Sequence, residues 1–548
     1  MDTERKPGYS HRSPSYAGIV VAVIWFSGFS WAQTTQSSLP HIVHQDGRYA
    51  LIVDDSPFLV LGAQINNSSA WPAMLPKVWP AMEYLQVNTV EMPVYWEQLE
   101  PEKGHFDFSL VDTLLSEARD HKVRVILLWF GTWKNGSAHY MPLWMKRDPQ
   151  RYPNLIGRDG KPVDSPSPHS QASLDADIQA FTALMQHLKD ADPQHTVIMV
   201  QVENEPGTWG SVRDYSPQAN KLFTGPVPVE LLTALNKPTT APIPNWTEAF
   251  GKDGDEFFHA WSIARYIGQV AAAGKAVYPL PMYVNASVRD PIESEHPSEF
   301  EHGAANANVL PIWKNAAPAI DIFAPDIYRP DSARYLKTLD LYHRSDNPLF
   351  VPETGRGEQY SRYFFAALGR QAIGFAPFGV DYTAYADDPP GSSRITEASL
   401  TPFAMNYRAI GPMAREIARL NFQGKLQAAV EGDGQVLQTL VFDHWKADVS
   451  YGLQERRNVK QPTGNPTPVG RALIAQLGDD EFLVTGFFCR IHFHPIDDKQ
   501  PMQYLRVEEG QYQDGQFQPI RIWNGDQTDW GLNFSSAPQV LRVLLSTR

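Results

Sequence analysis

Two short stretches of the chain place glutamates directly after strand-like text. In the first, TVIMVQVENEPGTWG from Thr196 to Gly210, an apolar run ends in Glu203, Asn204 and Glu205. In the second, PLFVPETGRG, a similar run ends in Glu353. Two converging carboxyl groups can hydrolyse a glycosidic bond, one as the proton donor and the other as the nucleophile or base. For each glutamate taken alone, a structural ion pair is the alternative interpretation.

Convergence of these glutamates requires a fold that gathers the ends of distant strands. Short apolar runs alternate with stretches of helical period along the chain, which indicates parallel strands joined by helical crossovers. Eight such units predict a (β/α)8 TIM barrel, an α/β fold whose active sites lie at the C-terminal ends of the strands. A doubly wound open sheet is the alternative, but no glycine-rich phosphate-binding motif supports it. The predicted strands span residues 58–64, 87–93, 123–130, 196–202, 281–286, 319–325, 348–353 and 372–378.

The character of the sequence changes after about residue 420. Short alternating runs separated by Gly, Asp, Asn and Pro replace the helical stretches, which predicts an antiparallel β-sandwich. We therefore expect a catalytic barrel domain over residues 40–420 and a C-terminal all-β sandwich domain over residues 425–548. The segment 206–254, rich in Pro, Thr and Asn, is expected to be a long loop over the barrel mouth.

The amino-acid composition limits the kinds of molecule that the protein is expected to bind. The formal net charge of the 548 residues is -14, so nucleic acid is not expected to bind. Aromatic residues make up 12% of the chain, and many stand beside loop residues, where their flat faces suit a carbohydrate substrate. The single cysteine, Cys489, and the absence of an HExxH motif from the sequence predict no metal site, and no cofactor is expected. A homo-oligomer is left open.

The N-terminus carries the features of a secretory signal. Basic residues precede the apolar run AGIVVAVIWFSGF, and small residues stand at Ser30 and Ala32. We predict a signal peptide over residues 1–32, because the run is shorter than the roughly 20 apolar residues that span a membrane. The mature protein is then expected to be secreted or periplasmic, with no stable membrane insertion after cleavage.

Several of these motifs together resemble glycoside hydrolase family 35, the β-galactosidases of clan A, with a secondary likeness to family 42. The resemblance is carried by VQVENEPG and by the pattern W-x-x-x-EP-x-x-G-x-F-x-F that begins at Trp96. It implies a retaining mechanism in which Glu205 is the acid/base and Glu353 the nucleophile. It also implies that Asn204 holds the sugar 2-hydroxyl and that Tyr328 donates a hydrogen bond to the nucleophile.

Other expected substrate contacts follow from positions where the chain departs from the family pattern. Pro93 stands where family members have a sugar-contacting tyrosine, and Tyr95 and Glu97 are the nearest replacements. After the third strand, GTWKNGSAH lacks the glutamate that normally grips galactose, which leaves Asn135 as its stand-in. Trp133 and Trp209 are expected to line a dry cleft.

The leading hypothesis is a secreted, retaining exo-β-galactosidase that removes terminal β-D-galactosyl residues from oligo- or polysaccharides such as xyloglucan side chains. One alternative is a clan A enzyme that acts on another β-glycoside, such as a glucoside, a mannoside or an arabinose-configured sugar. The other is a carbohydrate-binding barrel without turnover.

Overall fold

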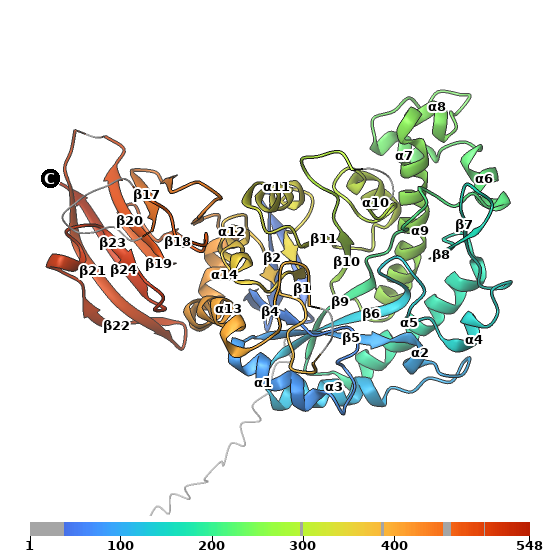
Figure 1. Ribbon diagram of the computed structural model, residues 1–548, viewed down its shortest axis with the longest axis horizontal. Coiled ribbons are helices and arrows are strands. Elements are labelled where there is room, and N and C mark those ends of the chain that lie inside the picture. Colours follow the sequence, from blue (N-terminus) through green and yellow to red (C-terminus); the bar gives the residue numbers. More distant parts are fainter. Residues whose placement is uncertain (1–37, 296–299, 385–387, 453–461, 498) are drawn as a thin grey trace, which may run out of the picture. The chain divides into compact units, whose positions relative to one another are not determined.

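The computed structural model describes residues 38–295, 300–384, 388–452, 462–497 and 499–548, and residues 38–548 form one compact unit (Figure 1). The predicted signal peptide lies outside the described residues. A search of the described helices for one apolar and long enough to cross a bilayer finds none.

The core of the fold is a ring of parallel strands. Its sheet has the order β12-β14-β4-β5-β6-β9-β10-β11-β13. Each predicted strand overlaps one of these, which confirms the eight-unit pattern. The strands are β4 (Val60–Gln64), β5 (Thr89–Tyr95), β6 (Arg124–Lys134), β9 (Val197–Asn204), β10 (Met282–Ser287), β11 (Ile322–Ile327), β12 (Phe350–Val351), β13 (Glu353–Thr354) and β14 (Gly374–Phe375).

The ring closes at its seventh strand, which is divided in two at Pro352. The first piece, β12, pairs with β14, and the second piece, β13, pairs with β11. Proline has no N–H to donate, so it interrupts a ladder where it stands. Because the two ends of the sheet are consecutive pieces of one strand, the barrel is closed, as the predicted (β/α)8 fold requires.

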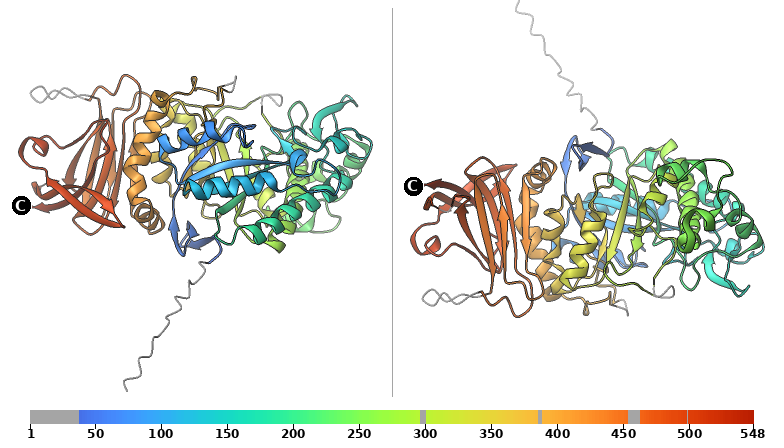
Figure 2. Two further views of the ribbon diagram at one scale, coloured as in Figure 1. Left: turned by 90° about the horizontal axis from the view of Figure 1, so that it is seen from below. Right: turned by 90° about the horizontal axis from the view of Figure 1, so that it is seen from above.

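Helices cover the outside of the barrel (Figure 2). In α3 the apolar residues recur with helical spacing and are buried, which shows how a 3.6-residue period packs one face of a helix against the strands: Leu110, Val111, Leu114, Leu115 and Ala118. The main barrel helices are α1 (Leu75–Leu85), α3 (Ser109–Asp120), α5 (Gln171–Ala191), α9 (Gly254–Val277), α10 (Leu310–Ala316), α11 (Ser332–Tyr342), α12 (Tyr363–Leu368), α13 (Glu397–Ile410) and α14 (Ala414–Phe422).

Smaller elements decorate the barrel. A three-stranded antiparallel sheet precedes it, and short helices and a two-stranded sheet lie within its connections. The expectation of a loop over residues 206–254 was wrong, because three short helices form there. The N-terminus of α8 is stabilised by a capping box between Asn245 and Glu248. These elements are β1 (His41–Gln45), β2 (Arg48–Val53), β3 (Ser56–Phe58), β7 (Asn154–Ile156), β8 (Pro162–Pro166), α2 (Trp96–Leu99), α4 (Leu143–Lys146), α6 (Pro217–Phe223), α7 (Val229–Ala234) and α8 (Trp246–Phe250).

The C-terminal part is an antiparallel sandwich, as predicted. A six-stranded sheet has the order β15-β18-β19-β24-β21-β22, and a four-stranded sheet has the order β16-β17-β20-β23. Both sheets contribute to one apolar cluster, which includes the buried Cys489. The strands are β15 (Leu426–Val430), β16 (Leu437–Val441), β17 (Trp445–Tyr451), β18 (Arg471–Gln476), β19 (Glu481–Phe487), β20 (Cys489–Pro495), β21 (Met502–Gln513), β22 (Gln516–Ile522), β23 (Leu532–Phe534) and β24 (Val540–Thr547).

The larger sheet of the sandwich packs against the barrel. Its outer residues Leu473 and Phe487 belong to the same apolar cluster as the barrel residues. The buried guanidinium of Arg471 donates a hydrogen bond of 2.7 Å to Asn406 Oδ1 on α13. A charged group buried without a partner is costly, so this contact fixes the two parts to each other. The sandwich therefore supports the barrel wall that α12 and α13 form.

Candidate active site

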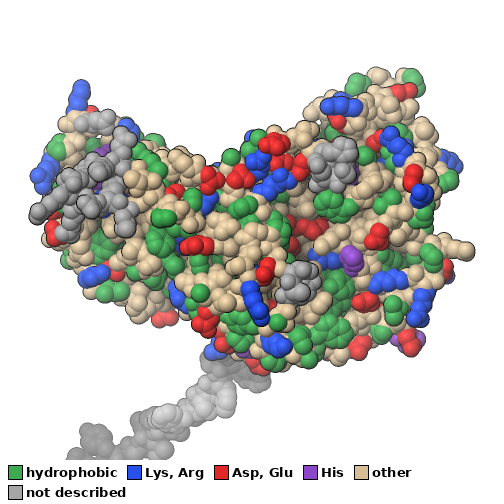
Figure 3. Space-filling view, viewed as in Figure 1, with side chains coloured by type: hydrophobic (Ala, Val, Ile, Leu, Met, Phe, Trp, Pro, Cys, Tyr) green, Lys and Arg blue, Asp and Glu red, His purple; other side chains and the backbone are tan. Residues whose placement is uncertain are grey.

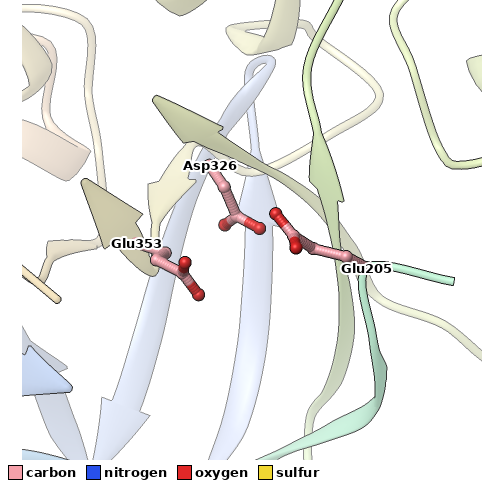
Figure 4. A group of neighbouring side chains, drawn as sticks. All are labelled: Glu205, Asp326 and Glu353. Atoms are coloured by element: carbon pink, nitrogen blue, oxygen red, sulfur yellow. The ribbon is translucent and has the colours of Figure 1, made fainter. Parts of the chain in front are cut away.

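Three carboxylates meet at the C-terminal end of the barrel strands: Glu205 after β9, Asp326 near the end of β11 and Glu353 in β13. Figure 4 shows their side chains pointing toward one another. One oxygen of each lies within 4.8 Å of the oxygens of the other two, and all three residues are buried. The fold thus brings together the two predicted glutamates, although they are far apart in the chain. We call these three residues the mouth cluster.

Hydrogen-bond donors surround Glu353. Gln64 at the end of β4 donates from Nε2 to Glu353 Oε2 at 3.1 Å, and the Tyr328 hydroxyl donates to Oε1. Donation to both oxygens favours the ionised form of a carboxyl group. An ionised carboxylate is the form that a nucleophile needs. Tyr328 therefore occupies the position that the family resemblance implied for it.

Glu205 is held through its backbone. Its N–H donates to Asn285 Oδ1 at 2.9 Å, and its carbonyl accepts a hydrogen bond from the Gly136 N–H at 3.1 Å. Burial, and then the charge of Glu353, raise the pKa of Glu205 to about 7, while Lys134 opposes the shift. A carboxyl group with this pKa can both give and take a proton near neutral pH, which is the property of a general acid/base.

Lys134, at the end of β6, connects two of the predicted substrate-binding residues. Its ammonium donates to Asn204 Oδ1 at 2.7 Å and to Asn135 Oδ1 at 2.5 Å. With its oxygen occupied, Asn204 retains a buried amide nitrogen that has no acceptor among the described residues. That nitrogen could donate to a sugar hydroxyl. Asn135 is exposed, and its side-chain oxygen already accepts the hydrogen bond from Lys134.

Trp133 belongs to the barrel wall. It is fully buried, its ring packs edge-on against Tyr266 with the centroids 4.8 Å apart, and its backbone N–H donates to Glu203 Oε2 at 2.7 Å. Burial, and then the charge of Asp177 of α5, raise the pKa of Glu203 well above its ordinary value. We call Glu203 and Asp177 the inner pair. This pair lies behind the strand end that presents Glu205.

Trp209 lies at the surface, 41% exposed, on the loop that follows Glu205. A Cβ atom added at Gly136 would stand 3.0 Å from the Trp209 ring and 2.6 Å from Glu301 Oε1, so glycine allows these segments to approach closely. Both carboxylate oxygens of Glu301 are buried without a donor among the described residues. Burial, and then the charge of Glu205, raise the pKa of Glu301 well above its ordinary value, so it carries a proton.

The contacts of Tyr95 and Glu97 lead away from the mouth cluster. Tyr95 is buried, and its hydroxyl accepts a hydrogen bond from the Ala70 N–H at 3.1 Å. Glu97 forms an ion pair with Lys146 at 3.1 Å. The structure therefore does not place these two residues beside Glu205 or Glu353, and their role as substrate contacts stays a prediction.

An ion-pair network fixes the segment that carries Tyr328. The next residue, Arg329, pairs with Asp290 and Glu295 from the loop after β10, and Arg334 of α11 also pairs with Asp290, at 2.6 Å. Figure 3 shows acidic and basic side chains interspersed over this part of the face. The loop after β10, which leads to Glu301, is thereby tied to α11.

Three residues of the site were missed from the sequence. Asp326 stands in FAPDIY at the end of a predicted strand, so the rule that singled out Glu205 and Glu353 could have found it. Lys134 likewise stands at the end of a strand. Glu301 carries no such signal, because it comes from a loop. Among the described residues, the mouth cluster is also the one grouping whose ligand atoms are close enough to surround a metal ion.

Parts of the chain are similar in sequence to known β-galactosidases. Residues 69–267 match the glycoside hydrolase family 42 model, described as β-galactosidase, and residues 403–535 match a domain of unknown function. A β-galactosidase of Xanthomonas manihotis is 30% identical over 207 residues, which are 35% of this chain and 31% of that protein. The chain thus spans about a third of the length of this curated relative. Family 35 is not confirmed, and the matching model is that of family 42, the secondary likeness noted above.

Solved structures of β-galactosidases are also similar to the chain. The enzyme from Bacillus circulans sp. alkalophilus has a TM-score of 0.47 at 13% identity, over 66% of this chain and 57% of that one. The enzyme from the psychrophilic Marinomonas ef1 also has a TM-score of 0.47, at 14% identity over 68% and 62% of the two chains.

Proposed function

We propose that the protein is a retaining β-galactosidase with Glu205 as acid/base and Glu353 as nucleophile. One observation carries the proposal, namely that carboxylate oxygens of these residues lie within 4.8 Å of each other. Retaining enzymes hold the two carboxyl groups about 5 to 5.5 Å apart, whereas inverting enzymes leave about 6.5 to 9.5 Å for a water molecule. The family model over residues 69–267 and the Xanthomonas relative support galactose as the sugar.

The reaction would proceed in two steps. First, Glu353 attacks the anomeric carbon while Glu205 gives its proton to the departing oxygen, which leaves a glycosyl ester on Glu353. Then Glu205, now ionised, takes a proton from water, and the water oxygen displaces Glu353 from the same carbon. The buried Asn204 amide donates to the sugar 2-hydroxyl, a contact that strengthens in transition states of this kind.

We further propose that the enzyme acts on terminal galactosyl residues after export. The predicted signal peptide supports a secreted or periplasmic location, and a galactosylated polysaccharide such as xyloglucan is a fitting substrate for an exported enzyme. Residues at the rim, including the exposed Trp209, would contact the remainder of the glycan.

A panel of nitrophenyl glycosides tests the proposal, with the anomeric configuration of the product followed by NMR. We expect fastest turnover of the β-galactoside and β-galactose as the first product. First formation of the α-anomer would exclude retention. Faster turnover of a glucoside, mannoside or arabinoside would assign that sugar, in place of galactose, as the substrate. A complete lack of turnover across the panel would favour the carbohydrate-binding alternative.

The nucleophile can be tested separately. Glu353→Ala is expected to lower turnover by more than about 10⁴-fold, because the covalent step is lost. Added azide should restore turnover and yield the α-galactosyl azide, since azide fits the space of the missing carboxylate. An active Glu353→Ala enzyme without azide would contradict the assignment.

A further inference from the structure

We propose that Asp326 stays protonated through the catalytic cycle and positions Glu205, to which it donates a hydrogen bond whenever Glu205 is ionised. This role rests on the proposed retaining mechanism, in which Glu205 is ionised during the second step. Asp326 is then a positioning residue, because it acts through Glu205 and not on the sugar.

The geometry around Asn285 orients Asp326. The Asn285 side-chain oxygen accepts from the Glu205 N–H at 2.9 Å, so its amide nitrogen faces the other way and donates to Asp326 Oδ2 at 2.7 Å. One asparagine thus holds the backbone of Glu205 and the side chain of Asp326 in a fixed relation. A carboxyl group that is buried and held in this way cannot turn toward solvent.

The remaining oxygen of Asp326 faces Glu205. No N–H or hydroxyl donor among the described residues reaches Asp326 Oδ1, which is buried. The carboxyl group of Glu205 lies opposite it, and one oxygen of each of these two carboxyl groups lies within 4.8 Å of the other (Figure 4). Two carboxyl groups can share a hydrogen bond only if one of them carries a proton. A hydrogen bond between Asp326 and Glu205 therefore requires a proton on one of them.

The charges around Asp326 favour its keeping that proton. Burial, then the charges of Glu353 and Glu205, raise the pKa of Asp326 well above its ordinary value, and Lys134 opposes the shift. The other titratable groups that face it are tyrosines, whose pKa values burial raises, so they stay neutral: Tyr283, Tyr328 and Tyr342. Glu353 instead accepts two hydrogen bonds, from Gln64 and Tyr328.

The consequence for the reaction follows from the proton count. In the first step Glu205 gives up its proton and becomes an anion, while the charge of Glu353 is lost in the glycosyl ester. The Asp326 O–H then donates to one oxygen of Glu205, and the other oxygen remains available for water. When water attacks, its proton goes to Glu205, and Asp326 ends the cycle with the proton that it had at the start.

Two substitutions at Asp326 test the proposal. Asp326→Asn reproduces a protonated aspartate, because its oxygen can accept from Asn285 and its nitrogen can donate to Glu205. We expect this variant to keep nearly normal kcat and an unchanged alkaline limb of kcat/KM. Asp326→Ala removes the donor, so we expect kcat on nitrophenyl β-galactosides to fall about 10- to 100-fold, with a burst of nitrophenol because the second step has become slow.

The most discriminating measurement is the direction in which the alkaline limb of the pH profile of kcat/KM shifts. A donor to ionised Glu205 lowers the pKa of Glu205, so Asp326→Ala should move the limb to higher pH. If Asp326 were an anion, it would raise the pKa of Glu205, and both substitutions would move the limb to lower pH. Such a shift, or equal loss of kcat in Asp326→Asn and Asp326→Ala, would overturn the proposal. Loss of activity on chelation that added Mg²⁺ or Ca²⁺ restores would also overturn it, because a cation would then hold the cluster.

A measurement without substrate separates this proposal from the proposed function. The infrared carbonyl band of protonated carboxyl groups should lose one component in Asp326→Asn near neutral pH. If no glycoside is turned over but the component is lost, the proposed function fails while the protonation of Asp326 stands. If the component remains in Asp326→Asn, Asp326 was ionised and the proposal fails.

Discussion

Glu203 and Glu205 are two residues apart in the sequence, but their carboxyl groups lie in different surroundings. Glu203 belongs to the inner pair and Glu205 to the mouth cluster, and burial raises the pKa of each carboxyl group. In a regular strand these two side chains would point to the same face. Here both residues have a positive φ, 64° and 43°, so the backbone leaves the strand geometry and sends the two carboxyl groups to different places.

Asp177 of the inner pair accepts hydrogen bonds from three side chains. Asp177 Oδ1 accepts from the Trp129 indole at 3.0 Å, and Asp177 Oδ2 accepts from the Thr132 hydroxyl at 2.7 Å and the Tyr266 hydroxyl at 3.3 Å. Since every one of these groups donates, Asp177 is the ionised member. Glu203 then carries the shared proton, because its other oxygen is occupied by the Trp133 N–H. A pair satisfied in this way has no reason to change its protonation.

The mouth cluster lacks such donors around Glu205. Instead, one oxygen each of Asp326 and Glu353 lies within 4.8 Å of an oxygen of Glu205. The difference indicates that full hydrogen bonding makes a buried carboxyl structural, while incomplete hydrogen bonding leaves a proton that can move. In the proposed mechanism, the mouth cluster supplies the groups that exchange protons, and the inner pair supports the strand end that carries Glu205.

The largest difference between the two regions should appear when Glu205→Gln is compared with Glu203→Gln. Glu205→Gln removes the mobile proton, so we expect kcat/KM to fall about 10²- to 10⁴-fold on galactosides with poor leaving groups. Nitrophenyl galactosides, which need less protonation, should suffer less. Glu203→Gln keeps a donor for Asp177 and an acceptor for Trp133, and its activity should stay close to normal. Equal losses in both variants would contradict the proposed division of roles.

The inner pair should matter for stability instead. Glu203→Ala leaves Asp177 buried with one donor fewer and opens a cavity, so we expect the free energy of unfolding to fall by about 3 to 5 kcal/mol. Urea denaturation followed by tryptophan fluorescence measures the loss. Glu203→Gln is the matched control and should cost less than about 1 kcal/mol, because both hydrogen bonds remain. A large loss in the glutamine variant would show that Glu203 is ionised.

The two sites should also differ in how pH affects stability. Folding raises the pKa of Glu205 from its ordinary value of 4.5 to about 7. The folded state therefore binds the proton more tightly than the unfolded chain, and the stability that this proton contributes is full below pH 4.5 and disappears as the pH rises through 7. Glu205→Gln cannot ionise. It should gain on the order of 3 kcal/mol over the parent protein above about pH 7, and nothing near pH 4.

Thermal unfolding of the parent protein and Glu205→Gln across this pH range checks the expectation. Glu203→Gln serves again as the control, and its difference from the parent should stay constant through the same window. A gain for Glu205→Gln that did not depend on pH would show that Glu205 does not titrate in the folded protein.

The smallest effect is expected at Glu97, outside both regions. Its pair with Lys146 is partly exposed, with 38% and 31% of the two side chains accessible. Exposed pairs of this kind contribute under about 1 kcal/mol. We expect Glu97→Gln to change neither stability nor KM for galactosides beyond this range. A clear rise in KM would restore Glu97 as a substrate contact.

Much of this arrangement could be predicted from local patterns. The alternation of apolar runs and helical stretches indicates the barrel. Active sites of this fold lie at the C-terminal ends of the strands, and this rule singles out Glu205 and Glu353. The same rule applies to Asp326, which directly follows the predicted strand 319–325. Lys134 lies beyond the predicted strand 123–130 and reaches a strand end only because β6 continues to that residue. The three short helices within residues 206–254 were missed because they are too short for a helical period to show.

The sequence by itself determined the order of the elements, the two glutamates at strand ends and the change to an all-β tail, because each of these depends on near neighbours in the chain. Only the tertiary structure decided which carboxyl groups share protons. Hydrogen bonding joins Glu205 to Asn285 and Glu353 to Gln64, residues that are remote in sequence. The pKa of a buried acid depends on such partners and on the loss of water around it, and neither is encoded in local sequence.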